Sequence, residues 1–100
     1  ALMTTSPGRK DDGGKPDFSL LDPTALLTVV KVLTFGASKY GADNWKTVPD
    51  MERRYFAAAN RHLWAWYSGE ETDESGLPHL AHAIASLFIL LAFSLHKPKT

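Results

Sequence analysis

The chain has 100 residues, enough for one domain, and its 44% apolar and 22% charged residues are typical of a globular protein. Eleven Lys and Arg residues balance eleven Asp and Glu residues, so the net charge does not favour binding to nucleic acid or to an anionic membrane. Cysteine is absent, which excludes disulfides and thiolate metal sites and agrees with a cytoplasmic location.

The N-terminal 16 residues are rich in glycine, proline and charge, and they lack the apolar stretch of a secretory signal. Such a segment buries too little apolar surface to fold alone, so residues 1–16 are predicted to form a flexible arm. Phe18, Leu20 and Leu21 are expected to anchor this arm to a single helical domain over residues 17–97.

Hydrophobic periodicity predicts three helices, over about residues 23–40, 50–68 and 77–96. The first has a good N-cap in Asp22, followed by a proline that suits the first helical turn. The predicted fold is therefore all-α, a three-helix unit with an extended Gly/Pro-rich N-terminal arm.

The predicted third helix is apolar nearly all round its second half, as a helix buried on several sides would be. Its main stripe consists of Leu80, Ile84, Leu87, Leu91 and Leu95. The apolar run is shorter than the ~20 residues of a bilayer span, so no membrane is expected as a partner. Because three helices cannot surround this one and a chain this short has a marginal core, we expect a homo-oligomer, a dimer or higher, to complete the bundle.

Three histidines are candidates for catalytic residues. His79 and His82 stand three residues apart, so their rings share one helix face. His62 lies late in the second helix, and an antiparallel neighbour would bring it near the start of the third. One of the three suits a general base near neutral pH. The simpler alternative is that these are hydrogen-bonded structural histidines.

Four acids fall within residues 70–74, directly before the third helix. Glu70, Asp73 and Glu74 are candidate ligands for Mg²⁺ or Mn²⁺, because both ions prefer oxygen ligands. A solvated loop, with Asp73 or Ser75 capping the third helix, is the alternative. The short separation from the histidines favours one shared site.

Cationic and aromatic residues near the end of the first helix, in the second helix and in the arm suit a nucleotide. Arg and Lys bind phosphates, whereas Tyr and Trp stack on a base. Ordinary surface charge is the alternative reading. The candidates for nucleotide binding are Lys10, Lys15, Lys39, Tyr40, Asn44, Trp45 and Arg61.

Several blocks occur together in one order: GRKDDGGKP at 8–16, FGASKYG at 35–41 with Asn44-Trp45, RHL at 61–63, and GE, D and ESGLPHLAHA between 69 and 83. Together they resemble the phage family of dATP/dGTP diphosphohydrolase N-terminal domains, over about residues 8–93. The resemblance implies a helical, oligomeric, MazG-like enzyme that uses carboxylate-held Mg²⁺ to split a nucleoside triphosphate into monophosphate and pyrophosphate. MazG enzymes carry E-E-x-x-E on one helix and E-x-x-D on the next, whereas no predicted helix here does.

Three functions remain open from the sequence. The first, favoured by the resemblance, is metal-dependent hydrolysis of a (deoxy)nucleoside triphosphate in the host cell cytoplasm. The second is a non-catalytic protein that binds or sequesters a nucleotide or cyclic nucleotide and so counters host defence signalling. The third is a structural oligomerisation domain whose polar cluster only joins helices.

Overall fold

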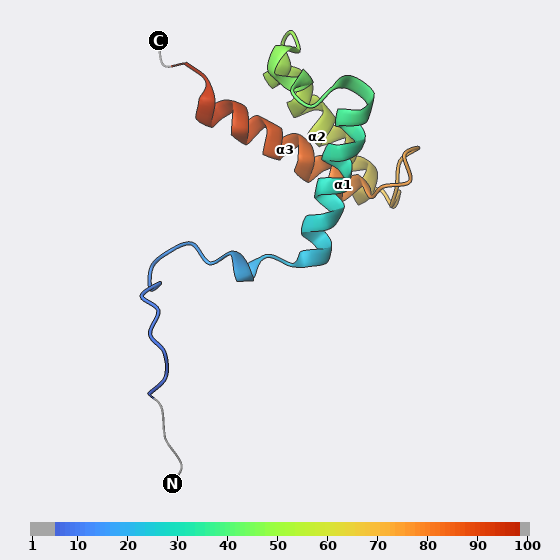
Figure 1. Ribbon diagram of the computed structural model, residues 1–100. Helices are drawn as coiled ribbons and strands as arrows, with labels where there is room; N and C mark the ends of the chain where they lie inside the picture. The colour runs from blue at the N-terminus through green and yellow to red at the C-terminus, as the bar shows by residue number, and fades with distance from the viewer. Residues whose placement is uncertain (1–5, 99–100) are drawn as a thin grey trace.

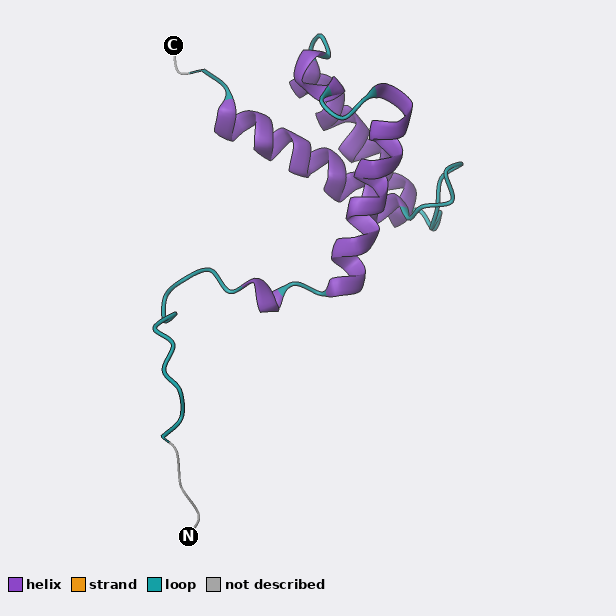
Figure 2. Ribbon diagram, in the orientation of Figure 1, coloured by secondary structure: helices purple, strands orange, loops and turns teal. Residues whose placement is uncertain are grey.

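The computed structural model describes residues 6–98, and over this range the chain is helical and has no β-strand beyond one isolated bridge (Figures 1 and 2). Each α-helix begins and ends within two residues of its predicted bounds. Residues 1–5 of the predicted arm lie outside the described residues. The elements are η1 (Phe18–Leu20), α1 (Pro23–Tyr40), η2 (Asn44–Thr47), α2 (Met51–Tyr67) and α3 (His79–His96).

Local signals explain where α1 begins and ends. The Asp22 carboxylate accepts a hydrogen bond from the backbone N–H of Ala25 at 2.8 Å, and Pro23 is the first helical residue. Gly41 ends the helix with φ 96°, a conformation that favours glycine. By contrast, α3 follows Pro78 without a side-chain cap, so the alternative that Asp73 or Ser75 caps this helix is wrong.

The N-terminal half of α3 lies at the centre of the fold and packs against both α1 and α2 (Figure 1). Apart from His79, its buried side chains are small, and helices approach more closely where such residues meet. Ala81 and Ala85 form a core cluster with Val32 of α1. On α2, Ala59 is buried as well. Close packing of small side chains, rather than a core of large apolar side chains, holds the three helices together.

The large apolar stripe of α3 is exposed within the single chain. Exposure rises along it from 37% at Leu80 to 71% at Leu95. The single chain therefore leaves this stripe uncovered, and the oligomer expected to cover it stays a prediction. Within the described residues α3 is also the one helix with the length and apolar composition of a membrane span, although its first half is packed against the other helices.

Residues 6–22 are exposed and extend away from the helices (Figure 1). Phe18 and Leu20 are 79% and 84% exposed, and Leu21 is exposed as well. The prediction that these residues anchor the arm to the helical domain is therefore wrong for the single chain, because no helix covers them.

We expect Ala85→Leu to lower the free energy of unfolding by about 1–3 kcal/mol, because extra methylenes would force α1 and α3 apart. Urea denaturation followed by circular dichroism measures this change. Ala25→Leu is the matched control, since Ala25 lies exposed on α1 and should change stability by less than ~0.5 kcal/mol. Equal effects of the two substitutions would contradict the packing described.

Candidate functional site

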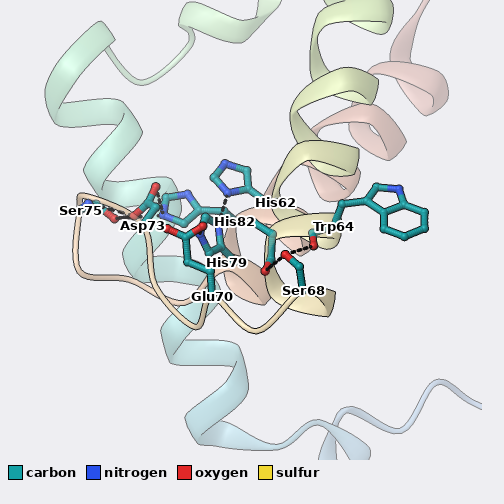
Figure 3. Close-up of polar contacts among 9 residues, drawn as sticks. His62, Trp64, Ser68, Glu70, Asp73, Ser75, His79 and His82 are labelled. Carbon is teal, nitrogen blue, oxygen red and sulfur yellow. Dashed lines mark hydrogen bonds and ion pairs between the residues drawn. The ribbon is translucent and has the colours of Figure 1, made fainter.

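The loop between α2 and α3 folds back on itself and places its polar residues beside the first turn of α3 (Figure 3). An isolated antiparallel bridge joins Thr72 to Pro78, and the His79 N–H donates to the Glu71 carbonyl at 2.8 Å. Gly76 makes the turn with φ 79°. This closure sets the position of Asp73 and Ser75 (Figure 3).

Three histidines converge where α2 meets α3, as the predicted antiparallel packing requires. His62 Nδ1 lies 2.8 Å from His79 Nδ1, so one of these nitrogens donates to the other. The His62 ring also stacks on His82, with centroids 4.5 Å apart. His79 is buried, whereas His62 and His82 are half-buried.

Asp73 contacts this cluster from the loop. Its Oδ2 lies 3.2 Å from His82 Nε2, and its Oδ1 accepts hydrogen bonds from the backbone N–H and the hydroxyl of Ser75. Burial alone raises the pKa of Asp73, but the Ser75 hydrogen bonds and the neighbouring His82 and His62 outweigh it, so the net pKa lies below its usual value. Asp73 is therefore a carboxylate at neutral pH.

The surroundings of His62 lower the pKa of its imidazole. Burial lowers its pKa, and the neighbouring His82 and His79 lower it further, while Asp73 acts in the opposite direction. An ordinary histidine has a pKa near ~6.5. His62 is therefore neutral near pH 7 and keeps a lone pair on one ring nitrogen.

Glu70 approaches His79 from the same loop. Its Oε2 lies 3.4 Å from His79 Nε2, an ion-pair distance without hydrogen-bond geometry. Within residues 6–98 this buried nitrogen consequently has no hydrogen-bond partner. The carboxylate is close enough to orient the ring electrostatically.

One group in the described part of the chain has the spacing of metal ligands. His62, Asp73 and His82 each offer one atom, and these atoms lie within 4.8 Å of one another. Of the three acids predicted to hold a metal, the structure brings only Asp73 into this group; Glu70 lies against His79, and Glu74 lines a cleft. Residues 70–74 do spell E-E-x-x-E, but in a loop, so they cannot present their carboxylates along one helix face as a MazG helix does.

A cleft of about 1270 Å³ opens beside the cluster, between α1, α2, α3 and the two connecting segments. It exceeds the ~300–1,000 Å³ of typical small-molecule sites. Lys10, Lys15, Glu70 and His79 do not line it. Most residues predicted for the site do: Lys39, Tyr40, Asn44, Trp45, Arg61, His62, Asp73, Glu74 and His82.

Ser75 is the site residue whose role the sequence analysis missed. Its hydroxyl lies 3.0 Å from His82 Nε2 and also donates to Asp73, so it connects the loop with α3. The Asp-x-Ser spacing at a turn, typical of an Asx turn, was the signal that would have identified it.

The pKa of His62 predicts a pH-dependent stability. The unfolded chain takes up a proton on this residue near pH ~6.5, whereas the folded chain does so at lower pH. The unfolded state then binds more protons, so the free energy of unfolding should fall as pH drops from about 7.5 to 5.5. Asp73 acts only below its ordinary value of 3.8, outside this window.

Urea denaturation of the metal-free chain across this range measures the slope. His62→Gln should make it shallower, whereas His96→Gln, at an exposed histidine far along α3, should leave it unchanged. A slope that His62→Gln does not alter would refute the assignment.

Comparison with known proteins gives two matches. The chain is 36% identical over 91 residues to a dATP/dGTP diphosphohydrolase of Salmonella phage PMBT28, a match that covers 91% of this chain and 31% of that protein. This chain thus spans about a third of the length of that relative. No solved structure matched. The family model described as dATP/dGTP diphosphohydrolase, N-terminal, matches residues 5–100, and the chain belongs to that family.

Proposed function

We propose that this domain binds a purine deoxynucleoside triphosphate in the cleft and hydrolyses it to monophosphate and pyrophosphate, in the cytoplasm of an infected cell. One observation carries the proposal: a single cleft is lined by cationic side chains, by aromatic rings and by the His62–Asp73–His82 group. The name of the phage relative supports the choice of dATP and dGTP.

The cleft suits a polyphosphate by charge. Four cationic side chains line it, Lys39, Arg53, Arg54 and Arg61, against two acids. Arg53 is paired with Asp50 at 3.0 Å, whereas no ion pair involves Arg61 among residues 6–98. A guanidinium binds phosphate oxygens through two parallel hydrogen bonds, so Arg61, next to His62 in sequence, is the proposed phosphate ligand.

Tyr40 and Trp45 line the same cleft and supply flat apolar surface for a base. Lys39 Nζ lies 5.0 Å from the centre of the Tyr40 ring, which places a cation beside that surface. From Val32 to Tyr40, both on the cleft wall, α1 advances about 12 Å along its axis. The wall is therefore long enough for base and phosphates to bind at separate points.

The proposed reaction is hydrolysis of the bridge between the α- and β-phosphates. A water oxygen bonds to the α-phosphorus, the bridging P–O bond breaks, and pyrophosphate leaves with the bonding electrons. The proton of the attacking water passes to a basic group on the cleft wall, for which the Glu74 carboxylate is available. A divalent cation, Mg²⁺ or Mn²⁺, bound near Asp73 would supply charge neutralisation at the phosphates.

Incubation with dATP and dGTP in the presence of Mn²⁺, followed by mass spectrometry, tests this proposal. The chain should release monophosphate and pyrophosphate, and Asp73→Asn should slow release by at least ~100-fold because the cation near position 73 loses its charged ligand. Glu52→Gln is the matched control, since this exposed acid lies in the first turn of α2 and outside the cleft.

Other outcomes would refute hydrolysis. Intact nucleotide recovered only after the protein is denatured, with no product, would show a sequestering protein instead. If neither product nor bound nucleotide is found, a structural oligomerisation domain is the function that remains.

We further propose that a second copy of the chain covers the exposed stripe of α3. The accessible surface is 8358 Å², whereas a folded monomer of 11.0 kDa exposes about 5600 Å². The excess includes the extended arm, and it exceeds the roughly 1,000–2,500 Å² that each chain contributes to the interface of an obligate dimer. Self-association would bury this surface without requiring another protein.

Sedimentation velocity tests the oligomer. The wild-type chain should sediment as a dimer or larger, and Leu87→Glu should shift it toward monomer because a buried carboxylate has no partner. Thr24→Glu, at an exposed polar position of α1, should change nothing. A wild-type monomer at high concentration, or one that binds detergent micelles, would refute self-association.

A further inference from the structure

We infer that His62, Asp73 and His82 bind one first-row transition-metal ion, in the range from Mn²⁺ to Zn²⁺, in preference to Mg²⁺. The site rests on its own geometry, and only its role in hydrolysis rests on the function proposed above. The inference replaces the set Glu70, Asp73 and Glu74 predicted from the sequence to hold Mg²⁺ or Mn²⁺, because only Asp73 belongs to the cluster.

Three separate segments supply the ligands: α2, the loop and α3. Their atoms lie within 4.8 Å of one another. An ion about 2.0–2.2 Å from each ligand requires the ligand atoms to be about 3–4 Å apart. Closure by roughly one ångström, within reach of side-chain rotation, therefore completes the coordination.

Contacts behind two of the ligands, Asp73 and His62, already fix their orientation. Ser75 holds one Asp73 oxygen and leaves the other facing His82 Nε2. His79 holds His62 Nδ1 and leaves the other nitrogen of that ring for an ion. Ligating histidines characteristically bond through their second nitrogen to a fixed partner, and Glu70 in turn approaches His79.

The donor set selects the class of ion. Imidazole nitrogen suits Mn²⁺, Fe²⁺, Co²⁺ and Zn²⁺, whereas Mg²⁺ binds through oxygen and keeps most of its water. Two histidines and one carboxylate leave positions for water or phosphate from the cleft. Mn²⁺ satisfies both this donor set and the cation expected for the proposed hydrolysis.

Partial burial separates this group from an ordinary surface cluster. The side chains of His82 and Asp73 are 11% and 18% exposed. Neutral imidazole nitrogens and a carboxylate oxygen gathered largely out of solvent are donors that a divalent ion can bind.

Titration of the chelator-treated chain with Co²⁺, followed by visible absorption, tests the site without any nucleotide. We expect one ion per chain, with a spectrum typical of nitrogen and oxygen ligands. Calorimetry should show tight Zn²⁺ binding and at least ~100-fold weaker Mg²⁺ binding. His82→Ala and Asp73→Asn should each weaken Co²⁺ binding by ~100-fold or more. Loss of a residue that only orients a ligand already weakens metal binding by ~10–100-fold.

His96→Ala is the matched control, because His96 lies exposed at the far end of α3 and outside the cluster. It should leave Co²⁺ affinity unchanged. His79→Gln should weaken binding while the folded helical signal persists, which identifies His79 as a positioning residue. Circular dichroism of each variant verifies folding.

The metal site and the proposed function fail differently. No Co²⁺ binding by the wild-type chain, equal binding by His82→Ala, or equal affinity for Mg²⁺ overturns the metal site. If the nucleotide is still hydrolysed with Mg²⁺ alone, the function stands without this site. If the chain binds the metal but neither hydrolyses nor retains a nucleotide, the metal site stands and the proposed function is refuted.

Discussion

The close approach of α2 and α3 is the interaction on which the site depends. Small residues on both helices, Ala59 on α2 and Ala83 on α3, are buried and allow that approach. Their smallness brings His62 into hydrogen-bond distance of His79 and into a stack with His82. A bulkier seam would leave the three imidazoles as separate side chains on two helices.

The fold was largely predictable, because its boundaries rest on local chemistry. Asp22, Pro23 and Gly41 determine α1 by capping and backbone preference, which depend on no distant residue. The placement of the core was not predictable in the same way. Periodicity identifies an apolar face such as Leu80 to Leu95 but does not say what covers it, and the alanines that do pack carry a weak hydrophobic signal.

The site was predictable as a set of residues but not as an arrangement. Spacing alone paired His79 with His82, and antiparallel packing brought in His62. For the four acids of residues 70–74, the sequence does not indicate which carboxylate reaches the histidines. The bridge between Thr72 and Pro78 distinguishes them, because it turns Asp73 toward His82. That loop geometry depends on pairings across the turn, which no single residue encodes.

The closed loop also bears on how the chain folds. Asp73, Ser75 and His82 lie within ten residues of one another and are joined by short-range hydrogen bonds, so this half of the cluster can assemble while α1 is still unattached. His62 is a more distant neighbour and joins only when α2 docks. The contacts of the cluster thus divide into a local half, closed within ten residues, and a long-range half that requires α2 and α3 to pack together.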